Sequence, residues 1–197
     1  MIKITKLVVA SHNQGKIGEI KKLLKQLNIE VISSAELNIS DIEETGTTFA
    51  ENAKIKAETT SLACGLPCLA DDSGLCVDAL NGRPGVYSAR YAPDRNFELG
   101  IKKLLSEIEQ TKSNNRKAHF SCCLAFARPK EKTIFFEGRV DGKISSQPQG
   151  KNGFGYDPIF IPDGYDQTFA ELGNDIKNTM SHRSRALEKF IKELSQG

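Results

Sequence analysis

Two adjacent carboxylates, Asp71 and Asp72, follow an apolar stretch and carry the strongest chemical signal in the chain. The run LADDSGL predicts a strand that ends at this acidic pair, with Ser73 and Gly74 turning the chain. Neighbouring carboxylates repel each other, and a divalent cation placed between them and a phosphate removes that repulsion. A polar turn with an Asp-Ser-Gly signature explains the same residues equally well. The accompanying motifs must therefore decide between a cation site and a polar turn.

A second acidic pair, Glu43 and Glu44, precedes Thr45 and Gly46 in a polar, turn-like segment. Mg²⁺ takes oxygen ligands, usually one or two carboxylates together with substrate phosphates and water. One glutamate from this segment and one aspartate from the other meet that demand. A solvated Glu-Glu pair is the competing interpretation.

A third motif, SHNQGK, joins an expected strand to an expected helix. Backbone N–H groups and a lysine at a helix N-terminus suit phosphate oxygens. The spacing is not that of a Walker A loop, because Ile17 follows Lys16 and no hydroxyl is placed for magnesium. An ordinary β-α turn is the alternative. The candidate phosphate-contacting residues are Ser11, His12, Asn13, Gln14, Gly15 and Lys16.

The segment GKNGFGYDP places an aromatic pair among glycines. Glycines beside Phe154 and Tyr156, among them Gly155, allow an aromatic face and backbone atoms to approach a flat ligand. The carboxylate of Asp157 can then accept a hydrogen bond from a nucleobase N–H. A glycine-rich hairpin with core aromatics is the other interpretation.

A fifth cluster lies near the end of the chain, where Lys177 precedes Ser181, His182 and Arg183. Positive side chains in the first turn of a helix are unfavourable against the positive end of the helix dipole. Their presence predicts a compensating anion or base acceptor at that place. No G-x-S-x-G elbow or other activated nucleophile is present, so a covalent mechanism is not favoured.

Apolar periodicity predicts the elements that must position these motifs. Leu99, Leu104, Leu105 and Ile108 are expected on the inward face of one helix. Strands and helices alternate and the middle strands resemble hairpins, which indicates the α/β class with a mixed sheet. Strands are expected at residues 6–11, 30–33, 68–70, 75–80 (or a helical turn), 119–127, 133–144 (as one or two) and 156–161, and helices at 16–27, 48–64, 97–108, 168–172 and 181–194.

Composition limits the class of protein. The 197 residues are 39% hydrophobic, with 27 basic and 25 acidic side chains, which is the balance of a globular protein without a strong basic face for nucleic acid. No apolar run approaches the ~18 residues of a membrane span, and the start of the chain does not resemble a secretory signal, so we expect a cytoplasmic protein without a membrane. The five cysteines lack paired C-x-x-C spacing, which predicts reduced, buried thiols rather than a zinc site.

Taken in order, these motifs resemble those of the inosine triphosphate pyrophosphatase family over nearly the whole chain. The resemblance rests on SHNQGK, EETGTTFAENAKIKAE, LADDSGLCVDALNGRPGVYSARYA, GFGYDPIF and SHRSRAL. It implies a single domain over residues 1–197, in which an elongated mixed sheet and helices form two lobes around a central nucleotide-binding cleft. It also implies a homodimer that hydrolyses dITP, ITP and XTP to monophosphate and pyrophosphate with Mg²⁺, clearing them from the nucleotide pool.

The resemblance implies a role for each matching position. Asp72 resembles the general base and magnesium ligand, and Ser73 beside it resembles a substrate contact. Glu43, or Glu44 in the alternative register, resembles the second metal ligand, and the loop of residues 11–16 resembles the triphosphate-binding loop. Seven further positions resemble the family's purine-recognising residues: Phe154, Gly155, Tyr156, Asp157, Lys177, His182 and Arg183.

Two other functions are compatible with parts of the pattern. One is a non-catalytic nucleotide-binding or RNA-binding module that uses Phe154, Tyr156 and the basic C-terminal helix. The other is a phosphatase of a different α/β fold acting on modified nucleotides. The near-neutral charge and the paired carboxylates count against the first, and the identity of the product separates the second.

Overall fold

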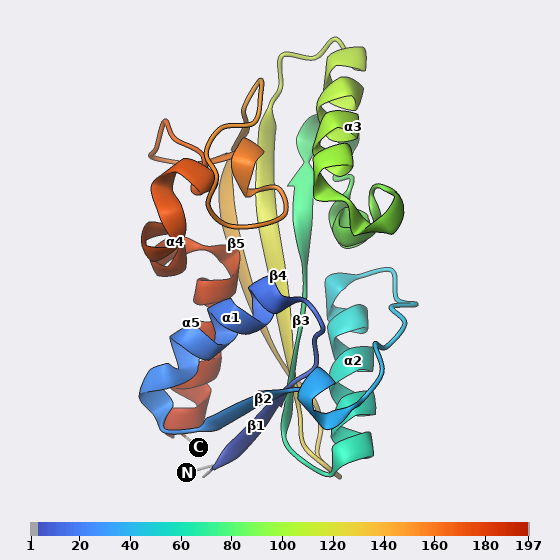
Figure 1. Ribbon diagram of the computed structural model, residues 1–197, viewed down its shortest axis with the longest axis vertical. Helices are drawn as coiled ribbons and strands as arrows, with labels where there is room; N and C mark the ends of the chain where they lie inside the picture. The colour runs from blue at the N-terminus through green and yellow to red at the C-terminus, as the bar shows by residue number, and fades with distance from the viewer. Residues whose placement is uncertain (1–3, 197) are drawn as a thin grey trace. The chain divides into compact units, whose positions relative to one another are not determined.

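The computed structural model describes residues 4–196 and contains one six-stranded mixed sheet in the order β2-β1-β3-β4-β5-β6 (Figure 1). Strand β1 pairs in parallel with β2 and with β3, and β5 pairs antiparallel with β6. The strands are β1 (Lys6–Val9), β2 (Glu30–Ser33), β3 (Cys68–Val77), β4 (Lys117–Ala127), β5 (Ile134–Ile144) and β6 (Phe160–Pro162). The α-helices are α1 (Gln14–Leu24), α2 (Phe49–Cys64), α3 (Phe97–Gln110), α4 (Phe169–Met180) and α5 (His182–Gln196). The predicted α/β class with a mixed sheet is confirmed.

The chain forms two compact units. The first comprises Met1–Asp72, Cys122–Gly138 and Arg183–Gly197, and the second comprises Ser73–Ser121 and Arg139–His182. Each unit has its own hydrophobic core, so each is described by itself.

In the first unit, helices cover both faces of the strands (Figure 1). Leu7 and Val9 point to the face that α1 and α5 cover, where Ile20 and Phe190 are fully buried. Val8 points to the opposite face, against α2. This follows from the alternation of side chains along a strand, and it makes β1 a continuous apolar run because both of its faces are buried.

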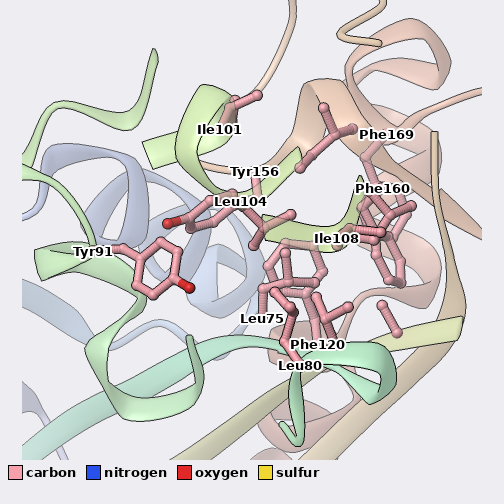
Figure 2. Close-up of a cluster of buried hydrophobic side chains, with 14 of the residues drawn as sticks. Leu75, Leu80, Tyr91, Ile101, Leu104, Ile108, Phe120, Tyr156, Phe160 and Phe169 are labelled. Atoms are coloured by element: carbon pink, nitrogen blue, oxygen red, sulfur yellow. The ribbon is translucent and has the colours of Figure 1, made fainter. Parts of the chain in front are cut away.

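In the second unit, a single aromatic-rich cluster fills the core, and Figure 2 shows most of it. Ile101, Leu104 and Ile108 of α3 pack there with strand residues that include Leu75 and Phe120. Leu99 was predicted to face inward with them, which is wrong: its side chain is 48% exposed. The helix begins at Phe97 after the N-cap Asn96, so Leu99 lies in the first turn, on the solvent side of the buried stripe.

The expected break at the acidic pair is wrong. Strand β3 does not end at Ala70 but continues as one ten-residue strand through Val77, with Asp71 and Asp72 in its middle. The expected turn at Ser73 and Gly74 therefore does not exist. A polar run inside a buried strand was interpreted as a turn because its partners, which come from distant segments, are invisible in the local sequence.

Two boundaries near the end of the chain also differ from the predictions. Residues 156–161 form a 3₁₀ turn (Asp157–Ile159) before the short β6, and not one strand. Helix α4 is longer than predicted, because its Thr168–Glu171 capping box starts a helix that continues past a kink at Gly173 to Met180. Lys177, which was expected between the predicted helices 168–172 and 181–194, consequently lies within α4. Among the helices that the structure describes, none combines the length and the apolar character needed to cross a membrane.

Candidate active site

The two aspartates of β3 point to opposite faces of the sheet. Asp71 contacts Lys16 of α1 and Arg183 of α5, whereas Asp72 contacts Asn52 and Lys56 of α2. Consecutive residues of a strand must diverge in this way. The acidic pair is therefore two separate carboxylates with different partners, and only one of them lies beside the second acidic segment.

Asp71 is the centre of a buried ionic network. Its Oδ1 lies 2.7 Å from Lys16 Nζ, and its Oδ2 accepts hydrogen bonds from Arg183 Nε at 2.8 Å and from Cys122 Sγ at 3.1 Å. The Arg183 guanidinium, 1% exposed, also pairs with Glu19. Burial by itself would raise the pKa of Asp71, but the guanidinium and the Lys16 ammonium hold it well below its usual value.

These contacts explain the positive side chain in the first turn of α5. An anion was predicted there, and the protein supplies Asp71 and Glu19 as anions for Arg183. The guanidinium thereby ties α1, β3 and α5 together. A direct contact of Arg183 with a nucleobase stays a prediction.

Asp72 lies in the more reactive environment of the two. Its Oδ2 accepts a hydrogen bond from Asn52 Nδ2 at 3.1 Å, and its Oδ1 lies 3.5 Å from Lys56 Nζ. Burial, together with the charge of Glu44, raises the pKa of Asp72 to about 6, against the opposing effect of the Lys56 and Lys16 ammonium groups. A carboxylate with a pKa this near neutrality suits proton transfer at physiological pH.

From the second acidic segment, Glu44 lies near Asp72. Glu44 Oε1 lies 2.5 Å from Lys56 Nζ, the same ammonium that approaches Asp72. Glu43, in contrast, is exposed. Of the two glutamates, Glu44 is therefore the one that lies beside the Lys56 ammonium near Asp72, and the choice of metal ligand between Glu43 and Glu44 stays a prediction.

Lys56 and Asn52 were not predicted as site residues. They are one helical turn apart on α2, at an i, i+4 spacing that places them on the same face. Lys56 Nζ also donates to the backbone carbonyl of Asp71 at 2.8 Å. The polar residues at these positions, inside the otherwise small apolar face of Ala53 and Ala57, were the available signal, because a buried lysine requires anionic partners.

The loop between β1 and α1 has the predicted form of a helix N-terminus. Asn13 is the N-cap, and its Oδ1 accepts from Lys16 N at 3.1 Å. Ser11 Oγ accepts from Asn13 N at 3.1 Å, and His12 Nδ1 lies 3.4 Å from Asp41. With no acidic residue in its first turn, α1 presents an end that suits an anion. Phosphate binding by Gln14, Gly15 and the other residues of this loop stays a prediction.

The second unit brings together Phe154, Asp157 and Lys177 of the predicted purine-recognising set. Lys177 Nζ lies 2.6 Å from Asp157 Oδ2 and 4.6 Å from the centre of the Phe154 ring. The same carboxylate oxygen accepts from Phe154 N at 2.9 Å. Lys177 and Asp157 are each 1% exposed, so this is a buried ion pair whose ammonium also makes a cation–π contact.

Backbone conformation explains two of the glycines in this segment. A Cβ at Gly153 would lie 2.1 Å from Asp157 Oδ2, so only glycine permits the carboxylate to fold back on the loop. Gly155 has a φ of +66°, a conformation that other residues rarely adopt.

The remaining predicted residues of this unit are placed differently. Tyr156 is 2% exposed within the core, and its hydroxyl donates to the backbone carbonyl of Ser88 at 3.0 Å, so its ring is not an open stacking surface. His182 is buried and stacks on Phe120 with ring centres 4.8 Å apart. Ser73 is half-buried in β3.

Comparison with known proteins shows to which family this chain belongs. A model of the Ham1 family matches residues 7–193. The chain belongs to the Ham1 family. The predicted resemblance is thereby confirmed, since curated relatives of this chain are named dITP/XTP pyrophosphatase.

Two such relatives and two solved structures illustrate the similarity. The proteins named dITP/XTP pyrophosphatase from Oceanobacillus iheyensis and Bacillus subtilis are 49% and 47% identical to this chain, covering 96% and 98% of it and 98% and 99% of their own lengths. A HAM1 protein from Coxiella burnetii superposes with a TM-score of 0.91 at 42% identity, over 98% of this chain and 100% of that one. The Ham1 protein of Staphylococcus aureus gives a TM-score of 0.86 at 42% identity, over 96% and 98%.

Proposed function

We propose that this chain is a nucleoside triphosphate pyrophosphatase that hydrolyses the non-standard purine nucleotides dITP, ITP and XTP to the monophosphate and pyrophosphate, with Mg²⁺ as cofactor. One observation carries the proposal: Glu44 and Asp72, from segments 28 residues apart in sequence, converge on one Lys56 ammonium. The names of relatives nearly half identical over the full chain support the substrate class.

The donor set fits magnesium. Among the residues that the structure describes, no group of three or more His, Cys, Asp or Glu side chains is arranged to hold a metal. Mg²⁺ does not need one, because it binds through one or two carboxylates and completes its coordination with phosphate oxygens and water. Glu44 and Asp72 would be these carboxylates. Burial is the main cause of the raised pKa of Asp72, and the charge of Glu44 adds to it; a divalent cation would relieve the repulsion between the two carboxylates.

The reaction follows from the properties of the surrounding side chains. When bound, Mg²⁺ would neutralise the negative charge that develops on the phosphate oxygens. Asp72 takes a proton from the attacking water, whose oxygen forms the new bond to the phosphorus that carries the nucleoside. The bond from that phosphorus to the bridging oxygen breaks, and pyrophosphate leaves with the bond's electron pair.

The cations of the first unit assist this displacement. Lys56, whose pKa stays raised because the charges of Asp72 and Glu44 outweigh its burial, remains charged and orients both carboxylates. The N-terminus of α1, with Lys16 in its first turn, binds the phosphates. No covalent intermediate is required.

The second unit would supply recognition of the base. Hypoxanthine and xanthine present a 6-oxo acceptor where adenine presents an amino donor, and a site with a donor at that place rejects adenine because buried polar groups would be left unpaired. Phe154 offers an aromatic surface, and Lys177 and His182 are the candidate donors. Asp157 fixes Lys177 and the Phe154 backbone in place.

Three further features belong to the same proposal. The enzyme would act in the cytoplasm, would work as a homodimer, and would remove non-standard nucleotides before polymerases incorporate them.

The test is product analysis with purified protein. We expect dITP and XTP with Mg²⁺ to give monophosphate and pyrophosphate, and ATP to react far more slowly. Asp72→Asn is expected to lower kcat by about 10²–10⁴-fold, the usual contribution of a general base, while leaving the fold intact. Orthophosphate as the first product would indicate a phosphatase instead, and metal-independent, salt-sensitive binding of single-stranded RNA without turnover would indicate a binding module.

A further inference from the structure

Asn52 of α2 connects the two halves of the acidic centre. Its side-chain amide makes one hydrogen bond from each end: Nδ2 donates to Asp72 Oδ2 at 3.1 Å, and Oδ1 accepts from the backbone N–H of Gly46 at 2.8 Å. The side chain is fully buried, with 0% exposure. One rigid amide therefore joins β3 to the segment that carries Glu44.

The position of each end matters for the carboxylates. Gly46 is two residues after Glu44, so a bond to its N–H fixes the backbone from which Glu44 extends. Because Asn52 binds Oδ2 of Asp72, the other oxygen, Oδ1, is the one that faces Lys56 Nζ. Glu44 approaches the same Lys56 ammonium. Asn52 thus determines both which oxygen of Asp72 faces the centre and how closely the Glu44 segment approaches it.

Gly46 is itself shaped to this contact. A Cβ at that position would lie 2.7 Å from Asn52 Oδ1 and 2.6 Å from the Cβ of Glu51. The backbone of the acidic segment packs directly against the first turn of α2, where a side chain at residue 46 would push it away. The backbone at Gly46 can therefore lie close to α2 for two reasons: the Asn52 amide accepts its N–H, and Gly46 has no side chain to clash with α2.

We infer that Asn52 is a positioning residue for the metal-dependent reaction, holding Asp72 and the Glu44 segment at the separation that one divalent cation bridges. The inference rests on the proposed function, because it takes Asp72 and Glu44 as the metal ligands. Both ends of the Asn52 amide are engaged by Asp72 and Gly46, so Asn52 acts through these partners. It acts in the manner of groups behind the ligands of a metal site, whose loss costs about 10–100-fold in metal affinity or activity.

The neighbouring Glu51 provides a matched control. It lies on the same first turn of α2, and its carboxylate accepts hydrogen bonds from Thr47 N at 2.8 Å and Thr48 N at 3.1 Å. It therefore ties down the same turn without contacting Asp72. A purely structural role for Asn52 would make Asn52→Ala and Glu51→Ala behave alike.

The experiment measures Mn²⁺ binding to the substrate-free protein by electron paramagnetic resonance, together with kcat, KM for dITP and the thermal midpoint. We expect Asn52→Ala to weaken Mn²⁺ binding and to lower kcat by about 10–100-fold each, with a smaller change in KM. Glu51→Ala should lower the thermal midpoint and leave Mn²⁺ affinity and kcat near the wild-type values. Equal Mn²⁺ affinity in wild type and Asn52→Ala, or an equal loss in both variants, would overturn the inference.

A second variant covers the case in which Asn52→Ala does not fold. Asn52→Asp has the same shape and keeps the acceptor for Gly46 N–H, but it turns an acceptor toward Asp72 Oδ2. We expect kcat at saturating Mg²⁺ to fall by about 10-fold or more, since the fixed orientation of Asp72 is lost. A wild-type kcat in this variant would refute the role of Asn52, whereas a wild-type protein that neither binds Mn²⁺ nor hydrolyses dITP would refute the proposed function instead.

Discussion

Replacement of Asp71 by asparagine tests whether the buried ionic network holds the first unit together. The substitution keeps the size of the side chain, so no cavity opens, and removes only the charge. The Asp71 side chain is fully buried, and it faces two cations, Lys16 at 2.7 Å and Arg183 at 2.8 Å. Both cations would remain in place without this carboxylate.

The expected loss of unfolding free energy is large. Removing one partner from a buried ion pair costs about 3–5 kcal/mol, because the other charge stays desolvated. The lower end applies here, since Arg183 keeps Glu19 and the Lys16 side chain, 14% exposed, can regain water. For a chain of this length, about 3 kcal/mol corresponds to a fall of about 6–12 °C in the thermal midpoint.

The loss should depend on pH in one direction. The pKa of Asp71 is held well below its usual value in the folded state, so its ionised form stabilises the fold. The advantage of wild type over Asp71→Asn is then fully present above pH ~4, where an unfolded aspartate is ionised, and is lost as the pH falls toward the lower pKa of the folded protein.

Urea unfolding of both proteins across this pH range measures the effect. The matched control is Glu30→Gln, which removes an ion pair with Lys6 that spans a similar distance, 3.0 Å, but is 59% and 39% exposed. That variant should lose less than about 1 kcal/mol. A loss of this small size in Asp71→Asn, or a difference from wild type that stays constant down to pH ~2, would refute the reasoning.

Two further predictions separate roles within the site. Glu44→Gln should raise the Mg²⁺ concentration needed for half-maximal dITP hydrolysis by about 10-fold or more, and Glu43→Gln by no more than about twofold; the reverse order would assign the ligand to Glu43. Tyr156→Phe should lower the unfolding free energy by about 1 kcal/mol, because the Ser88 carbonyl loses its donor, and leave the KM for dITP unchanged. A raised KM with unaltered stability would show that the Tyr156 hydroxyl contacts substrate.

Local sequence predicted the elements whose formation depends on neighbours in the chain. The strand at Glu30–Ser33 and the capping box of Thr48 and Glu51 appear as expected, because alternation, apolar spacing and helix caps act over a few residues. It failed at β3, where a buried strand contains two aspartates. A strand with such residues is stable only because α1, α2 and α5 bring cations to them, and those helices are up to 112 residues away.

The types of residue at the candidate site came from the sequence, and their pairing came from the tertiary structure. Carboxylates at residues 43–44 and 71–72, a lysine at the start of a helix and an aromatic-glycine-aspartate segment were enough to indicate phosphate and nucleobase chemistry. The resemblance had indicated Asp72, but only the fold showed that Asp72 and Glu44 share the Lys56 ammonium, that Asn52 contacts Asp72, and that Arg183 pairs with Asp71. The physical reason is that the direction of a side chain follows from strand pleat and helix packing, which depend on contacts between distant segments.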